Sequence, residues 1–391
     1  MSRQSLEIRV SNSLGGVDAE AWDALVGEGS PFLEYAWLRG LEVTGCVEPE
    51  EGWLPQIMTA WRGERLVGAI PLYVKGHSRG EFVYDWSWAN LAAQLRVPYY
   101  PKLIAASPFT PVTGDRLLVH PDLEAAERAQ ILDALIGAAL NWARETGVAG
   151  LHFLFVAEWQ AEVLRSRGLM IRLSYQFHWK NPGYTSFEDF LGRFRAHRRT
   201  QIRREIRGLQ DAKVRLEFLS GQEIQPAHVD AVRHFYKATC EKFGPWTDQY
   251  LKDAFFDHVR VAFAHRTQLV LALDADDRPV AGTFSLIKGD RLYGRYWGCD
   301  EDIPFLHFNA CYYAPIERAI ALGVKVYEPG AGGHHKLARG FEPTLTHSAH
   351  WLADPRLADL LERHLHKERA AVIAEVEAMS KGLPFKVNPD P

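Results

Sequence analysis

Along the first part of the chain, apolar residues follow the spacing of a strand in some segments and that of a helix in others. This pattern predicts a mixed α/β fold. Residues 6–10 alternate as in a half-buried strand, and Asp18 can cap the helical pattern that follows it. A second, aromatic helix is predicted at residues 31–41. Residues 54–61 and 66–74 flank an Arg-Gly-Glu turn and together predict a β-hairpin. The chain therefore begins as strand, two helices and hairpin.

Strands and helices continue to alternate beyond the hairpin. We predict a strand in the aromatic residues 82–88, a helix at 123–146 that ends at Gly147, and a buried strand at 151–156. Residues 98–114 contain four prolines. Because each proline removes a backbone donor and restricts the residue before it, we expect an extended loop without regular structure there.

The second half of the chain repeats the pattern of the first. Residues 167–169 (RGL) and 178–179 (HW) recur as residues 339–341 (RGF) and 350–351 (HW), in both cases 172 residues later. A helix end before a glycine and one strand of the hairpin also recur, in the same order. Each half reads strand, two helices, hairpin, further strand, helix, strand, short helix, strand. We therefore predict an internal duplication of one α/β unit.

Length and composition agree with two domains. The chain has 391 residues, of which 47% are hydrophobic and 24% charged, so it has enough apolar material for two cores. We predict a first domain at residues 1–184, a basic linker helix at 185–210, and a second domain at 211–391 that carries the active site.

The overall charge excludes some partners. The formal net charge is −4, so no global positive field would attract DNA or an anionic membrane. Contact with a polyanion such as tRNA would require a local basic patch.

Cysteine spacing and hydropathy suggest a cytoplasmic protein. The four cysteines lie far apart and form no CxxC pair, which indicates reduced thiols rather than a disulfide framework. The first ten residues lack the apolar core of a signal peptide, and no apolar run reaches the ~20 residues that cross a bilayer. We expect a cytoplasmic protein without a membrane span; the sequence does not predict its oligomeric state.

A basic segment lies between the two predicted domains. From Arg193 to Arg207 there are seven arginines and one acid, and Arg195, Arg199, Arg203 and Arg207 recur every four residues. On a helix they form one stripe. Four like charges at this spacing repel one another, which favours binding of phosphates or carboxylates. A solvated helix whose arginines pair with local acids is the alternative.

Residues 328–341, EPGAGGHHKLARGF, combine flexible backbone with several groups able to act in catalysis. Glycines allow a left-handed backbone and a close approach to a ligand. Lys336 and Arg339 would share one face of a helix that restarts after Gly333. An ordinary loop with a solvated lysine and arginine is the alternative.

Neither a metal ion nor another bound cofactor is expected. The histidines near the C-terminus are the main candidates for metal ligands, but their spacing matches no recognised ligand pattern. These are His334, His335, His347 and His350.

Four motifs carry a resemblance to a known family. They are YYPKL…PFTPVTG at residues 99–114, HRRTQIRRE at 197–205, YGRYWGCDEDIPFLHFNACYY at 293–313, and GHHKLARGF at 333–341. A unit with a central hairpin and a strand–helix–strand finish resembles the GNAT acyltransferase fold. Two such units in tandem resemble the FemABX group of bacterial aminoacyl- and acyltransferases. The chain is most similar to a FemABX-related family of N-acyltransferases associated with peptidoglycan biosynthesis or recognition.

The resemblance implies a catalytic role for Lys336. In FemABX members a lysine shortly before a Gly-Phe pair lies near the acyl ester, and Lys336 matches that position. Attack of an amine on an ester or thioester builds negative charge on the carbonyl oxygen, which a fixed ammonium can stabilise. Glu328, His334 and His335 are the candidates for the base that removes the amine's proton.

The resemblance also implies substrate-binding residues. Arg199 and Arg203 on the basic helix match positions that help to bind a phosphate-bearing substrate, and Arg339 lies beside Lys336. Other candidates follow the second hairpin or lie in the first domain's proline-rich loop. These are Tyr293, Tyr296, Trp297, His307, Asn309, Tyr312 and Tyr313, together with Tyr99, Tyr100 and Lys102; Asp85 with Trp86 is a further candidate. Core packing is the alternative for any single aromatic residue.

The identity of the acyl donor stays open in the sequence. Acetyl-CoA enzymes of the GNAT type carry an [RQ]xxGx[GA] loop that holds pyrophosphate at a helix N-terminus. Residues 291–296 begin in this way but end in Tyr and lie in a predicted strand. This favours aminoacyl-tRNA over acyl-CoA as the donor. The acceptor would be an amine-bearing small molecule or peptide. A non-catalytic tandem module that recognises a peptide, sugar or nucleic acid is the third hypothesis.

Overall fold

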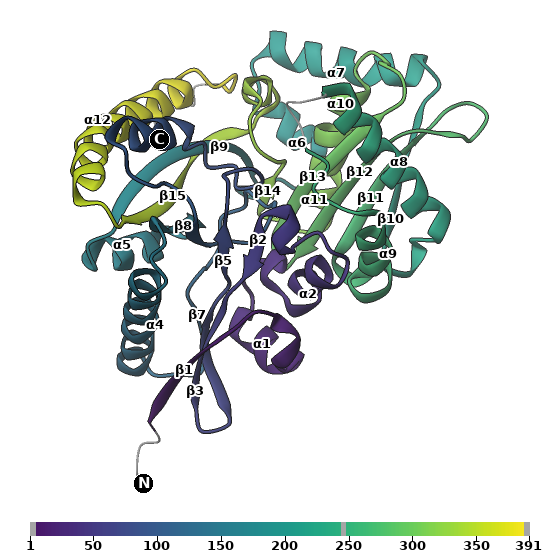
Figure 1. The fold of residues 1–391 in the computed structure, drawn as a ribbon. Coiled ribbons are helices and arrows are strands. Elements are labelled where there is room, and N and C mark those ends of the chain that lie inside the picture. Colours follow the sequence, from purple (N-terminus) through teal and green to yellow (C-terminus); the bar gives the residue numbers. More distant parts are fainter. Residues whose placement is uncertain (1–4, 244–247, 387–391) are drawn as a thin grey trace. The chain divides into compact units, whose positions relative to one another are not determined.

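The computed structural model of the chain describes residues 5–243 and 248–386, which group into two compact units (Figure 1). The first unit is formed by three segments and so is the second. The first comprises Met1–Ser174, Tyr250–Lys252 and Thr346–Ile373, and the second comprises Tyr175–Gln249, Asp253–Leu345 and Ala374–Pro391. The domain boundaries predicted above divide the sequence into its two repeats. The two compact units are groups of residues in contact, so they do not test those boundaries, which stay a prediction.

The first unit contains two sheets. One is antiparallel, with strand order β1-β3-β4-β7, and the other has the order β8-β6-β5-β2. Its elements are β1 (Leu6–Ser11), α1 (Ala19–Val26), α2 (Tyr35–Val43), β2 (Trp53–Pro55), β3 (Ile57–Arg62), β4 (Arg65–Ile70), β5 (Leu72–Lys75), α3 (Trp86–Leu95), β6 (Lys102–Ala105), β7 (Leu118–Val119), α4 (Ala125–Glu145), β8 (Gly150–Val156) and α5 (Glu158–Ser166). Helix α4 supplies the apolar stripe Ile131, Leu135 and Ala139 to the buried core of this unit.

The second unit is built around an antiparallel run of strands, β10-β11-β12-β13, followed by β14, which is parallel to β13. Its elements are α6 (Phe187–Gly192), α7 (Ala196–Asp211), β10 (Arg215–Ser220), α8 (Pro226–Phe243), α9 (Asp253–Ala262), β11 (Thr267–Leu273), β12 (Pro279–Lys288), β13 (Arg291–Cys299), α10 (Leu306–Phe308), the π-helical turn η7 (Asn309–Tyr313), α11 (Ala314–Ala321), β14 (Val326–Glu328) and the 3-10 helix η8 (His334–Arg339).

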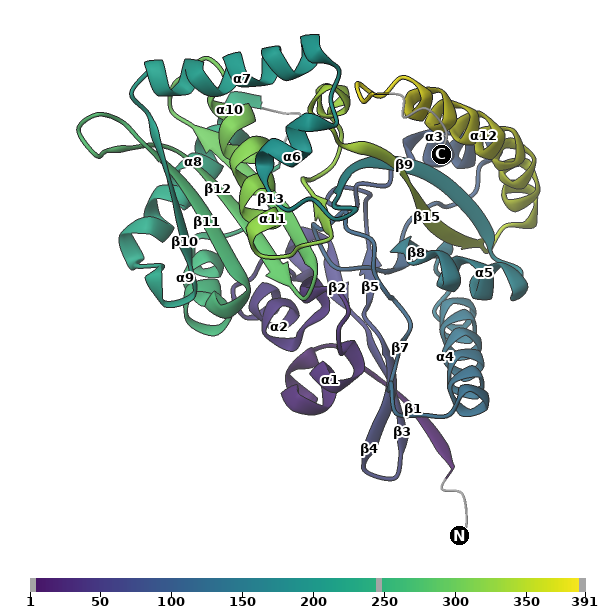
Figure 2. The ribbon, with the colours of Figure 1, turned by 180° about the vertical axis from the view of Figure 1, so that it is seen from behind.

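Helices cover both faces of the second unit's sheet. Figure 1 shows α8 and α9 over one face, and the reverse view in Figure 2 shows α11 over the other. Helix α8 packs closely because Gly298 has no side chain: a Cβ there would lie 1.8 Å from the carbonyl oxygen of Phe235. On the opposite face, Ile316 and Ile320 of α11 join a core cluster with Leu292 of β13.

The duplication predicted from sequence is confirmed by the order of the elements. Apart from α3 and β7 in the first half and the short α10 in the second, each half runs strand, two helices, hairpin, strand, helix, strand, short helix and long strand. A displacement of 172 residues carries the bounds of β9 (Met170–Lys180) onto those of β15 (Glu342–Leu352). Gly168 and Gly340 precede these two strands, with nearly equal φ values of +83° and +86°. The recurring Arg-Gly pair is therefore a left-handed helix end.

The ends of the two long strands, β9 and β15, each pair with a strand of the other repeat. The end of β9, from the first repeat, pairs with β14 in the second unit. The end of β15, from the second repeat, pairs with β8 in the first unit. Helix α12 (Pro355–Lys381) follows β15 and also contributes residues to both units. Each unit is therefore completed by a strand from the other repeat.

Most predicted elements of the first half are confirmed, but two predictions are wrong. The strand expected at residues 82–88 is an irregular turn followed by α3, because Phe82 has a left-handed backbone with φ +59°. The segment 98–114 is not without regular structure, since it contains β6, which pairs with β5 and β8. Its four prolines lie on either side of this strand rather than inside it.

The hairpin and the aromatic helix are present but interrupted. The hairpin's two strands each divide in two, as β2 with β3 and as β4 with β5. The helix predicted at residues 31–41 consists of the 3-10 turn Pro31–Leu33 and then α2.

Candidate active site

Strands β13 and β14 part shortly after they begin to pair. Their parallel pairing extends over three residue pairs and ends at Tyr293 and Glu328. The next residue of β13 is Gly294, where a Cβ would lie 2.9 Å from the Tyr327 hydroxyl. The chain that leaves β14 continues as Pro329 and Gly330, and Gly330 has φ +90°. The glycine-rich segment singled out in the sequence therefore begins at the divergence of these strands.

Lys336 lies buried inside this segment. Its side chain belongs to η8, and the residue is only 3% exposed. The Nζ atom donates a hydrogen bond of 2.7 Å to the carbonyl oxygen of Gly330 and lies 3.4 Å from that of Ala331. Burial lowers the pKa of Lys336 to about 8, although Cys311 opposes the shift. The structure thus holds a desolvated ammonium group at a fixed place.

Arg339, which lies on the same short helix as Lys336, forms an ion pair with a buried acid of the basic helix. The carboxylate of Glu205, on α7, accepts a hydrogen bond of 3.0 Å from Arg339 and another from the hydroxyl of Tyr313. The guanidinium of Arg339 also donates to the carbonyl of His335 at 2.9 Å and lies 3.3 Å from the ring centroid of Phe308. Both members of the pair are buried, so the charges of Glu205 and Arg339 compensate each other away from water.

The π-helical turn η7 supports the same network. Asn309 donates to the backbone carbonyl of Glu205 at 3.0 Å, and the Tyr312 hydroxyl lies 2.9 Å from Nε2 of His335. Burial lowers the pKa of His335, and the charges of Arg339 and Lys336 lower it further. A π-helical turn is uncommon and often marks a functional site. Here it brings Tyr312 to the Lys336 segment, and Asn309 and Tyr313 to Glu205 on α7.

Glu328 is also near this site, but its carboxylate already accepts a hydrogen bond from another side chain. It is 2% exposed and accepts a hydrogen bond of 3.0 Å from Arg291. Its second oxygen lies 3.7 Å from Nε2 of His178, at the end of β9. Burial lowers the pKa of His178 to about 3, and Arg291, Lys180 and Lys336 add to that effect. A role for Glu328 as the base stays a prediction.

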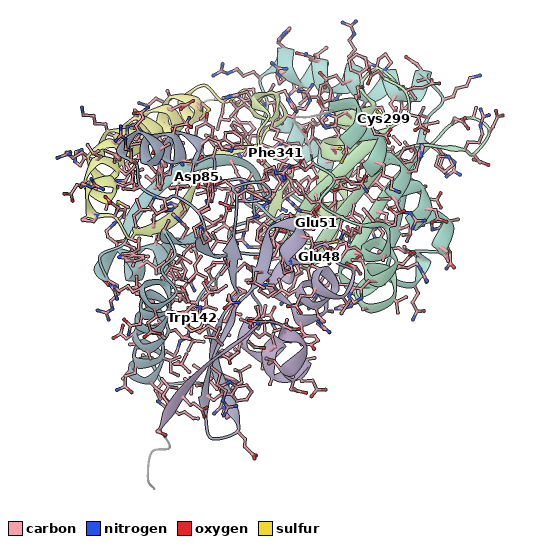
Figure 3. All side chains as sticks on the ribbon, in the orientation of Figure 1. Glu48, Glu51, Asp85, Trp142, Cys299 and Phe341 are labelled. Atoms are coloured by element: carbon pink, nitrogen blue, oxygen red, sulfur yellow. The ribbon has the colours of Figure 1, made fainter. Side chains whose placement is uncertain are left out.

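A cavity of about 380 Å³ opens beside His307, whose ring lies 5.8 Å from that of His335. Figure 3 places Cys299, one of the lining residues, at the end of β13 close to α10. The cavity is also lined by Thr239, Lys242, Trp297, Glu301, Asp302, Ile303, Pro304, Leu306 and His307. Its volume lies within the range of ligand pockets in proteins. Two of the predicted substrate-binding residues, Trp297 and His307, therefore form part of one cavity wall.

The structure brings most of the second-unit candidates together. His335, Lys336 and Arg339 share η8, while Tyr312 and Asn309 lie on the adjoining turn. His334 contacts the rings of Tyr175 and Phe177 instead. Tyr293 is 3% exposed and belongs to the core of the unit, whereas Tyr296 is partly exposed and packs against Tyr236. Their role in binding stays a prediction.

The basic helix is present as α7, with arginines on its outer side. Arg203 pairs with Glu188 at 2.5 Å, whereas Arg199, Arg204 and Arg207 form no ion pair with another described residue. Arg195 precedes the helix and donates to the carbonyl of Phe385 at 3.0 Å. Pairing with local acids thus neutralises only part of the stripe. The outer side of α7 keeps guanidinium groups available to an anion.

The first-unit candidates form a separate buried network. Lys102 is fully buried, and its ammonium donates to Ser78, Glu81 and Asp85. Tyr99 donates to Asp85 at 2.7 Å. The Tyr100 hydroxyl bonds with Ser78, also at 2.7 Å. This network joins β6 to the irregular segment before α3, where Figure 3 labels Asp85. A binding role for Tyr99, Tyr100 and Lys102 stays a prediction.

The two carboxylates around Lys102 differ in their protonation. Burial raises the pKa of Glu81 to about 7, although Lys102 opposes the shift. Burial also acts to raise the pKa of Asp85, but hydrogen bonds and charge from Lys102 outweigh it and leave the pKa below its ordinary value. Asp85 also accepts a hydrogen bond from Tyr99. We conclude that Asp85 is the ionised partner of Lys102.

Glu205 is the functional candidate that sequence reasoning missed. The signal was present: it is the only acid among seven arginines, and it lies three residues after Ile202 and four before Leu209. Those two residues and Glu205 form the buried face of α7. An acid on the apolar face of a helix requires a buried partner, which here is Arg339.

In residues 5–243 and 248–386, no group of three or more His, Cys, Asp or Glu side chains could hold a metal ion. Within the same residues, no helix is both long enough and apolar enough to cross a membrane.

Comparison with solved structures identifies the fold. FemX superposes with a TM-score of 0.54 over 88% of this chain and 98% of FemX, at 12% identity. The L-PGS from Bacillus licheniformis superposes with a TM-score of 0.52 over 88% of this chain and 96% of that protein, at 9% identity. The C-terminal domain of a putative lysylphosphatidylglycerol synthetase from Agrobacterium fabrum gives 0.55 over 89% and 96%, at 9% identity. The predicted α/β fold of two tandem GNAT domains is confirmed.

Comparison of the sequence identifies the family. No curated protein matches the chain. The model of the FemAB-like family, described as peptidoglycan biosynthesis/recognition, matches residues 13–387. The match spans both units and every motif that carried the resemblance in the sequence. The chain therefore belongs to the FemAB-like family of peptidoglycan biosynthesis or recognition.

Proposed function

We propose that the protein is an N-acyltransferase that transfers an acyl or aminoacyl group to an amine. The observation that carries the proposal is the buried ammonium of Lys336, held by the Gly330 carbonyl where β13 and β14 part. Its family membership and its GNAT fold support the same activity. The acceptor would be an amine-bearing small molecule or peptide, in keeping with the family's link to peptidoglycan.

The chemistry requires stabilisation of a developing negative charge. When an amine attacks an ester or thioester, the carbonyl oxygen gains charge, and an ammonium fixed beforehand stabilises it without having to reorganise. Lys336 is already desolvated, so its interaction with an oxyanion would be stronger than that of a lysine in water. No covalent enzyme intermediate is needed, because the donor is already activated and positioning lowers the barrier.

His335 is the base that the geometry favours. The residue is exposed, and its Nε2 contacts the Tyr312 hydroxyl, so the ring is held beside Lys336. Burial and two neighbouring cations lower its pKa, which keeps the imidazole neutral and able to accept a proton near neutral pH. Glu328 pairs with Arg291 and His334 contacts the rings of Tyr175 and Phe177, so both are less suited to this role.

The charges around the site favour aminoacyl-tRNA over acyl-CoA as the donor. The loop between β13 and α10 carries three consecutive acids, Asp300, Glu301 and Asp302. Asp300 pairs with His234 and Asp302 with Lys242, so Glu301 is the carboxylate that would repel the pyrophosphate of CoA from the helix that follows. In contrast, α7 presents several arginines that could accept an RNA phosphate chain.

A transfer assay with both donor classes tests the proposal. Purified protein would be incubated with aminoacyl-tRNAs or acyl-CoAs and an amine acceptor, and products followed by mass spectrometry. We expect transfer from one donor class and its loss in Lys336→Met, with activity retained in Lys325→Met, which removes an exposed lysine of the same unit. Full activity of Lys336→Met would overturn the assignment of that residue. Binding of a donor without turnover would instead favour a recognition module.

A further inference from the structure

We propose that strand β1 pairs with the β1 strand of a second molecule of the same protein, so that two chains share one continuous sheet. The proposal does not depend on the transfer activity. Strand β1 lies at one end of the four-stranded sheet of the first unit (Figure 1). It pairs with β3 on one side, and among the strands of the described residues none pairs with its other side. The backbone groups on that outer edge are therefore available to another strand.

The sequence of this strand is chemically symmetrical about its centre. Residues 5–11 read SLEIRVS, with Ile8 in the middle. When two such strands pair antiparallel with Ile8 opposite Ile8, similar residues lie opposite each other. These pairs are Leu6 with Val10 and Ser5 with Ser11. In the same register, Glu7 of each strand lies opposite Arg9 of the other. Every residue of the segment therefore faces a similar or an oppositely charged side chain.

The charges of this segment attract a second copy of it. Glu7 and Arg9 are 57% and 50% exposed, and within one molecule the carboxylate accepts two hydrogen bonds of 2.8 Å from the guanidinium. Charged side chains on an edge strand commonly prevent pairing. Here, pairing of β1 with itself would give each Glu7 a second guanidinium neighbour, from the other molecule. Opposite charges would then alternate across the contact, which stabilises an antiparallel pair.

The adjacent strand β3 holds Arg9 in place for this contact. Thr59 lies opposite Arg9 in the sheet, and the Arg9 guanidinium lies 5.0 Å from the ring centroid of Trp61. The indole of Trp61 donates a hydrogen bond of 2.8 Å to the Thr59 hydroxyl. A side chain that is already ordered loses less conformational freedom on binding. Arg9 is therefore prepared to meet a second carboxylate.

The other face of β1 carries apolar side chains that a second strand would cover. Leu6, Ile8 and Val10 pack against the core cluster that contains Ile131 and Leu135 of α4. All three remain only partly buried, as expected for a strand with a neighbour on one side. A second β1 would remove part of this apolar surface from water, which favours association. The two sheets of four strands would then form one sheet of eight.

Sedimentation equilibrium of the full chain measures this association. A contact through one short strand buries little surface and is therefore weak, so the protein concentration would be raised to about 0.5 mM. We expect a reversible dimer. Amide hydrogen exchange in residues 6–10 should slow as the protein concentration rises, because the outer backbone groups then become hydrogen-bonded. A protein that stays monomeric over the whole range would overturn the proposal.

Two charge-reversal variants test the register. Glu7→Arg and Arg9→Glu each place like charges opposite each other at two positions, so each should weaken dimerisation by about tenfold or more. An equimolar mixture of the two variants should form a mixed dimer about as stable as the wild-type dimer, because two arginines of one molecule then face two glutamates of the other. The mixture also controls for folding, since misfolded chains would not recover association on mixing.

Arg165→Glu is the matched control for a charge reversal. Arg165 is also about half exposed and pairs with an acid of its own element, Glu162, in the same unit. Its reversal should leave dimerisation unchanged. A dimer that is insensitive to Glu7→Arg and Arg9→Glu, or a mixture of these variants that stays monomeric, would show that β1 does not pair with itself and would refute the proposal.

Discussion

The carboxylate of Glu205 lies 3.0 Å from the guanidinium of Arg339, and both are shielded from water. This pair connects the basic helix α7 with η8, the short helix that carries Lys336. Arg339 also bonds to the carbonyl of His335, the residue before the lysine. The position of the Lys336 ammonium therefore depends on an acid 131 residues earlier in the chain.

Loss of Glu205 alone should lower both stability and transfer. Glu205→Leu leaves Arg339 buried without its counter-charge, and breaking a buried pair in this way destabilises a protein by about 3–5 kcal/mol. The free energy of unfolding would be measured by chemical denaturation. Transfer should fall mainly in kcat, since the residue positions Lys336 rather than binding substrate.

The double variant Glu205→Leu/Arg339→Leu separates the two effects. Replacing both charges with apolar groups should restore most of the stability, because neither charge is then left alone. Transfer should stay low, since η8 has lost its link to α7. A double variant with wild-type kcat would refute a positioning role for the pair.

The pH dependence of transfer should report Lys336. Its pKa of about 8 means that the ammonium is present below pH 8 and lost above it. The acceptor must itself be deprotonated to attack, so the rate should first rise with pH and then fall as Lys336 loses its proton. A kcat profile should show a descending limb near pH 8. In Lys336→Arg that limb should disappear, because an arginine stays protonated throughout.

Replacement of Lys336 should also raise stability. The folded-state pKa of about 8 lies well below the ordinary value of a lysine, which corresponds to about 3 kcal/mol against the buried charge at pH 7. Since the unfolded chain binds the proton more tightly, wild-type stability should increase as the pH rises from about 8 to 10. Lys336→Met should remove this dependence and unfold at a higher denaturant concentration at pH 7. A lower midpoint would contradict the lowered pKa.

Replacement of Lys102 should affect the stability of the first unit. Lys102→Met leaves Asp85 ionised and buried without its cation, so we expect a loss of about 3 kcal/mol in the free energy of unfolding. Lys102→Met/Asp85→Asn should recover part of this loss. If Lys102 instead served mainly to bind substrate, Lys102→Met would raise KM without lowering the denaturation midpoint.

The arginines of α7 should determine the salt dependence of RNA binding. With aminoacyl-tRNA as the donor, each arginine that neutralises a phosphate contributes about 0.7 to the slope of log K against log salt on a single strand. Arg199→Gln and Arg207→Gln should each reduce the slope by about that amount. Arg215→Gln is a suitable control, because Arg215 is exposed but pairs with Asp277. Unchanged slopes in all three variants would exclude α7 as the contact surface.

Much of the fold could be predicted from the sequence because its patterns are local. The hairpin, α4, β8 and the short helix before β15 follow from apolar periods, turn residues and glycines, and the repeat fixed their order. The two errors have a common cause. Residues 82–88 and β6 are joined through Lys102, Asp85 and Tyr99, and contacts between distant residues leave no periodic trace in the chain.

Individual residues of the site could be predicted from the sequence, but the contacts between them could not. Lys336 and Arg339 stood out because cations next to glycines are conspicuous. That Lys336 is buried, and that Arg339 pairs with an acid on α7, depends on tertiary packing. Glu205 was hidden by its surroundings, because among seven arginines a lone acid reads as a surface charge. Only its place on the apolar face of the helix indicates otherwise.

The exchange of β9 and β15 constrains how the chain can fold during synthesis. Domains of a nascent protein usually fold in order as they leave the ribosome. Here the first unit cannot close its sheet until residues 346–352 have emerged, and by then the strands of the second unit are already available. The first unit, although synthesised first, can therefore complete its sheet only after the strands of the second unit have been made.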